Sequence, residues 1–342
     1  MNIRDFGYAD INTDVTDGGI PARITAVHKE RYELVSEHGY GFGRVKAANY
    51  YNGTETWPTV GDFVLIEYND SGDSRILRTL PRRSYFTRLD PSSGGHGEQA
   101  VAANFDYVFI IQSLNKDYNI RKLERYLTES WQSGAEPVVV LTKADLTEEV
   151  SEYERRTAET VPGVRIVAVS ARTGYGMEEL EGYLKPGKTI VLLGSSGVGK
   201  SSLVNALAKE EIMETREIRE EDSRGRHTTT HRELIMLKSG VMVIDTPGMR
   251  ELGMWDVSIG LGQSFSDVEQ YFERCRFSDC RHQSEPGCAV REALESGELP
   301  ESRWASYCKL KREARFSNNK AGYFHDMQKH NKAYSRKKRG NK

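Results

Sequence analysis

The stretch GSSGVGKS at residues 194–201 is the feature that most constrains what this chain can fold into. It matches the pattern G-x-x-x-x-G-K-[ST], in which glycines let backbone N–H groups turn inward around phosphates. In this pattern the lysine, here Lys200, reaches the β and γ phosphates, and the hydroxyl of Ser201 binds Mg²⁺. The apolar run TIVLLG precedes the stretch and the helical pattern SSLVNALAK follows it. This strand–loop–helix context predicts a domain that binds a nucleoside triphosphate at the start of a helix.

Apolar runs alternate with helical patterns on both sides of this loop. The helical patterns are NIRKLERYLTESWQSG, which we expect to end near Gly134, and MEELEGYL. Such alternation implies an α/β domain with a mostly parallel sheet covered on both faces. We place this domain at residues 100–258. Its other predicted strands are NFDYVFIIQS, PVVVLTKAD, RIVAVSA and GVMVIDTPG.

Two further stretches predict the parts of a GTPase that respond to the γ-phosphate. In DTPG, Asp245 follows an apolar run and can hold Mg²⁺ through water, and the N–H of Gly248 can face the γ-phosphate. The hydrophilic residues 211–231 end in RGRHTTTH, and their threonine hydroxyls can bind Mg²⁺, as a switch I segment does. We favour Thr229 as this ligand, and the sequence does not separate it from its neighbours in the range 228–230.

The sequence TKAD predicts which base is bound. An aspartate after a buried strand can accept two hydrogen bonds from guanine that adenine cannot supply, so Asp145 favours GTP. The stem of Lys143 can lie along the base. Thr142 stands where such motifs usually have asparagine, and it keeps a hydroxyl that can bond locally. This motif precedes the phosphate loop, whereas the usual order is the reverse. A circular permutation explains the order, because a sheet needs strands that are adjacent in space rather than in the chain.

The predicted nucleotide site combines these motifs with Ser-Ala at 170–171, which matches the loop that backs the guanine. Many GTPases follow the switch II glycine with a glutamine that orients the attacking water, but here that position is Met249. His227 is the best local candidate for this role; the alternative is a solvated loop residue. We therefore name Lys200, Thr229 and His227 as catalytic, and Ser201, Thr229 and Asp245 as Mg²⁺ ligands. The predicted GTP-binding residues are Thr142, Lys143, Ala144, Asp145, Ser170, Ala171, Gly194, Ser195, Ser196, Gly197, Val198, Gly199, Lys200, Ser201, Ser202, Asp245 and Gly248.

Residues 21–89 predict a small all-β barrel of the OB type, because five short alternating segments are separated by turn signals. Such barrels often bind oligonucleotides, and a purely structural role is the alternative. The polar residues 1–20 predict a loose N-terminal tail. The Gly/Ser-rich residues 90–99 predict a linker or a mobile loop before the α/β domain.

Residues 259–342 predict a mostly helical domain that binds zinc and ends in a basic tail. Three thiols and one imidazole within fourteen residues satisfy tetrahedral Zn²⁺ with no open position, so one structural ion per chain is expected. Cys308 could replace the histidine, but it lies twenty residues further on and the compact set is preferable. The predicted zinc ligands are Cys275, Cys280, His282 and Cys288.

The charge distribution indicates which kind of partner to expect, and the apolar runs and cysteines indicate the compartment. Residues 309–342 hold twelve Lys or Arg and two Asp or Glu, a net charge of +10, in a chain whose net charge is −2. A basic tail on an acidic body favours a polyanionic partner, usually nucleic acid, over a tail that is only solvated. The apolar runs are strand-sized and the start MNIRDFGYAD has no apolar signal core, so we expect no membrane span and no secretion. Clustered cysteines fit a reducing compartment, and we expect a cytoplasmic protein.

The order of these motifs resembles that of one family. Base recognition, backing loop, phosphate loop, switch I and switch II follow one another as in a circularly permuted GTPase. GRHTTT, DTPG and the cysteine/histidine cluster carry most of the specificity. With its N-terminal barrel, the chain resembles the ribosome small-subunit-dependent GTPase family (RsgA, also called YjeQ) over nearly its whole length. This resemblance implies hydrolysis of GTP to GDP and phosphate, stimulated by the small ribosomal subunit, and a role in late maturation of that subunit through contacts with its rRNA.

Two other functions stay open on the sequence alone. A P-loop kinase or ATPase would share the phosphate loop, but Asp145 and DTPG argue against it. An RNA-binding regulatory GTP-binding protein, with slow turnover and a different RNA partner, would share the barrel, the metal site and the basic tail. Nothing in the sequence demands a dimer, and we expect a monomer that docks on a larger particle.

Overall fold

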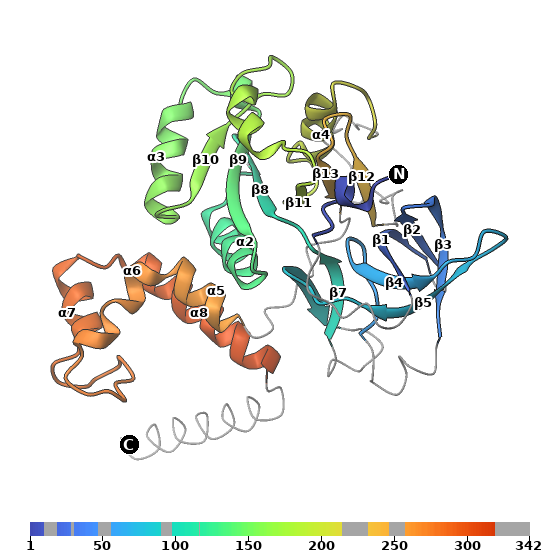
Figure 1. Cartoon of the computed structure of the whole chain (residues 1–342). Coiled ribbons are helices and arrows are strands. Elements are labelled where there is room, and N and C mark those ends of the chain that lie inside the picture. Colours follow the sequence, from blue (N-terminus) through green and yellow to red (C-terminus); the bar gives the residue numbers. More distant parts are fainter. Residues whose placement is uncertain are drawn as a thin grey trace, which may run out of the picture. The chain divides into compact units, whose positions relative to one another are not determined.

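The computed structural model describes residues 1–9, 19–28, 31–46, 56–89, 98–115, 117–213, 232–245 and 257–318. It divides the chain into two units, Met1–Leu252 and Gly253–Lys342. The first unit contains a barrel and an open sheet (Figure 1). Among the described helices, none is both long enough and apolar enough to cross a membrane.

The runs predicted as strands of the α/β domain form five parallel strands in the order β10-β9-β8-β11-β13. Each strand is rich in Val, Ile or Leu, and alternate side chains enter different hydrophobic clusters on the two faces. The predicted parallel sheet is therefore confirmed. The strands are β8 (Tyr107–Ser113), β9 (Glu136–Thr142), β10 (Arg165–Ala168), β11 (Thr189–Leu193) and β13 (Met242–Asp245).

Helices cover both faces of this sheet. Leu123 of α2 (Ile120–Gln132) packs into one cluster, together with residues of α3 (Val150–Thr160). Leu203 of α4 (Lys200–Ala208) packs into the cluster on the other face. The predicted helix MEELEGYL is a 3-10 helix, η4 (Met177–Tyr183). The sequence did not reveal α3, nor β12 (Glu233–Met236), which pairs antiparallel with β13.

A closed five-stranded barrel precedes the sheet, as predicted. Strand β1 pairs with β2 and β4, β3 pairs with β2 and β5, and β4 pairs with β5, which closes the ring. Its interior is filled by buried side chains such as Ile24, Leu34 and Ile76. The strands are β1 (Ile20–Val27), β2 (Tyr32–Ser36), β3 (Gly39–Val45), β4 (Phe63–Glu67) and β5 (Ser74–Thr79).

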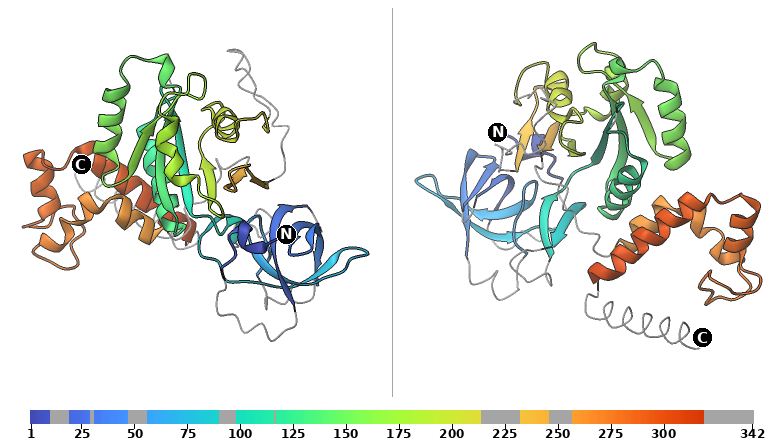
Figure 2. Two further views of the ribbon diagram at one scale, coloured as in Figure 1. Left: turned by 45° about the horizontal axis from the view of Figure 1, so that its top comes forward. Right: turned by 180° about the vertical axis from the view of Figure 1, so that it is seen from behind.

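The barrel and the open sheet are joined through one strand pair. Ala26 of β1 lies opposite Glu233 of β12, so the strands of both belong to a single sheet. Figure 2 shows the barrel at the β12 end of the open sheet, away from β10 and α3. A hairpin of β6 (Tyr85–Leu89) and β7 (Glu98–Ala103) follows the barrel. Strand β7 begins inside the stretch predicted as a linker, of which residues 90–97 lie outside the described residues.

The first residues of the chain pack against this junction, although we expected a loose tail. Ile3 and Phe6 of η1 (Ile3–Phe6) are buried in the cluster that contains side chains of β8 and β13. Ile3 and Phe6 are surrounded by polar residues in the sequence, so their burial was not predicted. The described start of the chain is therefore part of the core.

Arg23 on β1 is completely buried where the barrel meets the open sheet. Its guanidinium donates to the carbonyl oxygens of Phe6 at 2.5 Å, Asn104 at 2.8 Å and Gly61 at 3.2 Å. It also lies 3.2 Å from the sulfur atom of Met242 on β13. Burial lowers the pKa of Arg23 to about 9, so the side chain stays charged at neutral pH. One cation thus binds together four separate segments.

The second unit is mostly helical, as predicted. Its core contains Phe265, Val290 and Tyr307. The guanidinium of Arg303 reaches both carboxylate oxygens of Asp267 at 2.9 Å, which ties α8 to α6. The helices are α5 (Ser258–Ser264), α6 (Ser266–Glu269), η6 (Phe272–Arg274), α7 (Ala289–Ser296) and α8 (Glu301–Asn318).

Candidate nucleotide site and metal centre

The parallel strands bring the predicted motifs to one edge of the sheet. Strand β9 ends at Thr142, the first residue of TKAD, and β11 ends directly before Gly194. Strand β10 ends two residues before Ser170, and β13 ends at Asp245. Because the strands are parallel, these ends lie on the same side, where α/β sheets bind ligands. The permuted order of the motifs is therefore compatible with one site.

The phosphate loop has the backbone that its glycines permit. Gly197 and Gly199 have φ angles of 79° and 98°, in the left-handed region that side chains disfavour. A Cβ atom on Gly194 would lie 2.8 Å from the carbonyl oxygen of Ile111. The ammonium of Lys200 donates to the carbonyl oxygens of Gly194 at 2.9 Å and Ser195 at 2.8 Å. The lysine thus contacts the loop that is predicted to hold phosphates.

The TKAD motif is hydrogen-bonded to the phosphate loop. The buried hydroxyl of Thr142 donates to the carbonyl oxygen of Val198 at 2.5 Å and contacts that of Gln112 at 3.3 Å. The ammonium of Lys143 donates to the carbonyl oxygen of Gly197 at 2.8 Å. The hydroxyl of Thr142 therefore bonds locally, as the sequence suggested for a residue that replaces asparagine.

Asp145 has partners for both carboxylate oxygens. The hydroxyl of Ser170 donates to Oδ1 at 2.5 Å, and the guanidinium of Arg172 lies 2.6 Å from Oδ2. The hydrogen bond from Ser170, supported by the charge of Arg172, holds the pKa of Asp145 below its usual range. The carboxylate is therefore an anionic acceptor at neutral pH, which is the form that could accept hydrogen bonds from guanine.

Two basic residues at this edge were not predicted from the sequence to belong to the site. Lys122 in the first turn of α2 donates to the hydroxyl of Ser195 at 3.2 Å, and Arg172 pairs with Asp145. Lys122 belongs to no motif, and its only sequence signal is its place shortly after the strand that neighbours β11. Arg172 directly follows the Ser-Ala pair, which could have drawn attention to it.

The predicted switch residues are only partly within the described residues. Asp245 is the last residue of β13 and lies opposite Glu233 in the pairing with β12. His227, the threonines at 228–230, Gly248 and Met249 lie outside the described residues. Their assignments therefore remain predictions.

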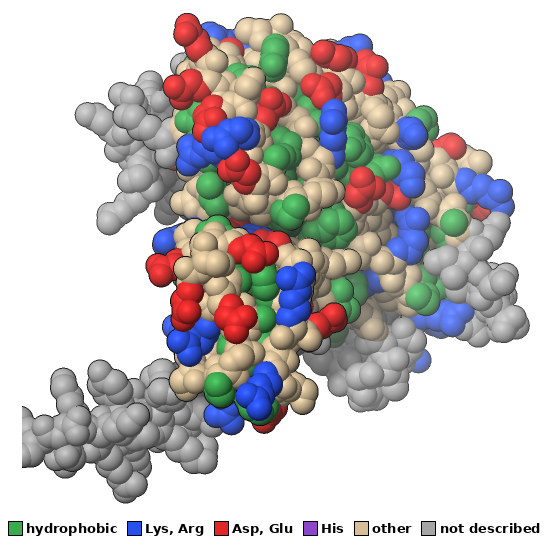
Figure 3. Space-filling model, turned by 90° about the vertical axis from the view of Figure 1, so that its left-hand side faces the viewer, with side chains coloured by type: hydrophobic (Ala, Val, Ile, Leu, Met, Phe, Trp, Pro, Cys, Tyr) green, Lys and Arg blue, Asp and Glu red, His purple; other side chains and the backbone are tan. Residues whose placement is uncertain are grey.

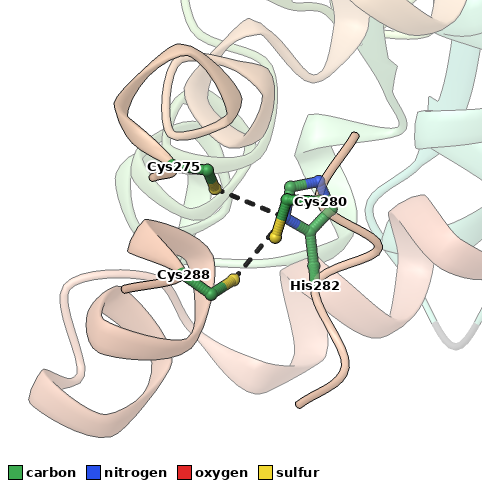
Figure 4. Close-up of side chains that lie close together, drawn as sticks. All are labelled: Cys275, Cys280, His282 and Cys288. Atoms are coloured by element: carbon green, nitrogen blue, oxygen red, sulfur yellow. Dashed lines mark hydrogen bonds between the residues drawn. The ribbon is translucent and has the colours of Figure 1, made fainter. Parts of the chain in front are cut away.

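The four predicted zinc ligands lie together in the second unit (Figure 4). Their ligand atoms are all within 4.8 Å of one another. The sulfur atoms of Cys275 and Cys288 are each 3.6 Å from Nδ1 of His282. A tetrahedral zinc ion with Zn–S bonds of about 2.3 Å holds its ligand atoms about 3.8 Å apart, so this donor set fits such an ion. Cys308 does not belong to the cluster.

The surroundings of this cluster fix the loop that carries it. The ring of His282 stacks on Phe272 with centroids 4.4 Å apart, and its backbone has a φ of 60°. Partial burial and the charge of Lys311 lower the pKa of His282, which favours the neutral imidazole that binds metals. The carboxylate of Glu285 accepts hydrogen bonds from backbone N–H groups of the same loop, which lower its pKa to about 2.

Comparisons with known proteins agree with this geometry. A family model described as RsgA GTPase matches residues 79–255. A relative from Listeria monocytogenes, named small ribosomal subunit biogenesis GTPase RsgA 1, is 48% identical over 299 residues, covering 87% of this chain and 84% of the relative. The chain belongs to the RsgA GTPase family. A relative from Methanosarcina acetivorans with the name RsgA is 43% identical over 265 residues, covering 77% of this chain and 72% of its own length.

Solved structures are similar as well. YjeQ from Thermotoga maritima matches with a TM-score of 0.61 and 28% identity, covering 86% of this chain and 98% of that one. YloQ, described as a circularly permuted GTPase, matches with a TM-score of 0.58 and 23% identity over 89% of this chain, which shows the shared fold. The predicted permutation and family are thus confirmed. Membership in a GTPase family also excludes the kinase and ATPase alternative.

Proposed function

We propose that this GTPase acts in late maturation of the small ribosomal subunit, through contacts with its rRNA, and that the subunit stimulates its hydrolysis of GTP to GDP and phosphate. The observation that carries the proposal is that hydrogen bonds connect TKAD to the phosphate loop and to Ser170 at one edge of the sheet. The 48% identity to a relative named for small-subunit biogenesis supports the choice of partner. We propose a cytoplasmic monomer.

We assign the nucleotide contacts to the residues gathered at this edge. Backbone N–H groups of 194–199 surround the phosphates, and the ammonium of Lys200, which lies against the carbonyl oxygens of Gly194 and Ser195, reaches the β and γ phosphates. Asp145 accepts hydrogen bonds from guanine once Arg172 leaves Oδ2, while Ser170 stays on Oδ1. Thr142 and Lys143 keep the loop in position beneath the nucleotide.

The assignment of the nucleotide site also suggests which residues bind Mg²⁺ and which residue positions the attacking water. We propose that Ser201, Asp245 and Thr229 hold Mg²⁺, which would neutralise negative charge as it develops on the phosphates. His227 would position the attacking water, because Met249 stands where many GTPases have glutamine. A water-positioning residue that is ordered only by a partner explains why turnover should depend on the small subunit.

We propose that the cluster of Cys275, Cys280, His282 and Cys288 binds one Zn²⁺ ion per chain. The donor set is three thiols and one imidazole with no gap for a substrate ligand, so the site is structural. The ion would hold the loop between η6 and α7, since Cys275 directly follows η6 and Cys288 directly precedes α7.

The barrel and the basic tail are the surfaces we assign to rRNA. Tyr40 on β3 is 65% exposed, and the guanidinium of Arg31 lies 3.6 Å from the centroid of the partly exposed Phe42 ring. An exposed aromatic ring, such as that of Tyr40, suits stacking on an unpaired base, and the cation beside Phe42 suits a phosphate. The face drawn in Figure 3 instead carries interspersed acidic and basic side chains, as a solvated surface does. The tail beyond residue 318 lies outside the described residues.

GTP turnover with and without purified small ribosomal subunits tests this proposal, with ATP as the control nucleotide. We expect a low rate for the protein alone and a strong rise on addition of subunits, with no rise for ATP. A GTPase rate that subunits leave unchanged would overturn the proposed partner. Specific binding to another RNA would then favour the regulatory alternative.

A further inference from the structure

Three lysine side chains contact the phosphate loop from different directions. Lys200 donates to the carbonyl oxygens of Gly194 and Ser195, and Lys143 donates to that of Gly197. Lys122 approaches from α2 and donates to the hydroxyl of Ser195 at 3.2 Å. The first two lysines belong to the recognised motifs, whereas Lys122 has no role in them.

The contacts of Lys200 indicate which end of the loop faces the terminal phosphates. A lysine in this position reaches the β and γ phosphates, and here its ammonium lies against Gly194 and Ser195. The base-recognition motif contacts the opposite end of the loop, at Gly197 and Val198. Lys122 therefore stands at the phosphate end, on the same residue as Lys200.

The position of Lys122 is fixed by the start of α2. The side chain of Asn119 caps the helix by accepting a hydrogen bond from the backbone N–H of Lys122 at 3.1 Å. The N–H of Asn119 in turn donates to the side chain of Gln112 on β8, the strand that pairs with β11. The Lys122 stem thus begins from an anchored turn, and the positive end of the helix dipole adds to its charge.

The ammonium of Lys122 has a neutral partner only, in the part of the chain that the structure describes. Its one contact there is the Ser195 hydroxyl, and no described carboxylate pairs with it. A hydrogen bond between a cation and a hydroxyl is weaker than one between a cation and a phosphate oxygen. A phosphate at this end of the loop would therefore draw the ammonium away from Ser195.

We propose that Lys122 contacts the γ-phosphate of bound GTP and makes the protein prefer GTP to GDP. The inference rests on the proposed nucleotide site and adds a residue that determines its specificity. Because GDP lacks the γ-phosphate, the interaction stabilises only the triphosphate complex. A lysine that merely held the loop in shape would support both nucleotides alike.

The test is the affinity of the full chain for labelled GDP and for a labelled non-hydrolysable GTP, measured by fluorescence titration. Lys122→Met is expected to weaken binding of the GTP analogue about tenfold and of GDP less than about twofold, because it removes one charge-assisted hydrogen bond. Lys122→Arg should restore most of the preference. Arg121→Met is the matched control, since it removes an exposed neighbouring charge from the same turn and should leave the preference unchanged.

Several results would overturn the proposal. Equal losses for both nucleotides in Lys122→Met, or no loss for either, would remove Lys122 from γ-phosphate recognition. So would a Ser195→Ala variant that loses the preference as Lys122→Met does, because the serine would then be the important group. A wild-type chain that binds neither nucleotide would overturn the proposed site as a whole. The assay contains no ribosomal subunits, so a failure of subunit stimulation is a separate result that concerns the proposed function alone.

Discussion

Replacing Arg23 with methionine is expected to destabilise the unit Met1–Leu252. The guanidinium is fully buried and donates to three carbonyl oxygens, those of Phe6, Gly61 and Asn104. Methionine donates no hydrogen bond, and each acceptor that loses its partner costs about 1–3 kcal/mol. Burial of the charged guanidinium is itself unfavourable and lowers the pKa of Arg23 to about 9. Removing this charge therefore offsets part of the free energy lost with the hydrogen bonds. We expect the free energy of unfolding to fall by about 3 kcal/mol.

Thermal unfolding followed by circular dichroism can check this magnitude. A change of 1 kcal/mol shifts the midpoint by about 2–4 °C in a unit of this size, so a fall of roughly 6–12 °C is expected. Arg31→Met is the matched control, because Arg31 is 43% exposed and its pair with Asp73 should contribute less than about 1 kcal/mol. An unchanged or raised midpoint for Arg23→Met would refute the reasoning, since packing would then outweigh the lost hydrogen bonds.

Three other predictions concern the two sites. Thr142→Val should weaken GTP and GDP binding equally, about five- to tenfold, because the loop loses its hydrogen bond at Val198, while Thr142→Ser should bind normally in the same titration. Atomic absorption should find one zinc ion per chain, and Cys280→Ser should lose both the ion and helical signal of the second unit; full retention of zinc would contradict the ligand set. His227→Ala should abolish subunit-stimulated turnover and spare nucleotide binding, and unchanged stimulation would exclude His227 from the mechanism.

The parts that the sequence predicted are those that local chemistry determines. The phosphate loop needs glycines at Gly197 and Gly199, and its strand and helix show clear apolar patterns. The cysteine and histidine spacing predicted a cluster that the structure brings together. The barrel could be recognised because turns separate its short alternating strands. In each case the deciding residues lie close together in the chain.

The parts that escaped prediction depend on contacts between distant segments. Nothing near Ala26 or Glu233 in the sequence indicates that β1 pairs with β12. The hairpin of β6 and β7 was missed because the Gly/Ser-rich residues between its strands look like a domain linker. The contacts of Lys122 are likewise invisible in the sequence, because Ser195 lies seventy-three residues away and single lysines are common on exposed helices.

Strand β1 pairs both with strands of the barrel and with β12 of the open sheet, so the two parts are mechanically coupled. If the barrel is held by a heavy particle, a pull on it passes along β1 into β12 through the pair of Ala26 and Glu233. Glu233 comes two residues after His231, the end of the predicted switch I segment. A displacement of the anchored barrel would therefore act directly on the strand that follows the segment expected to sense the γ-phosphate.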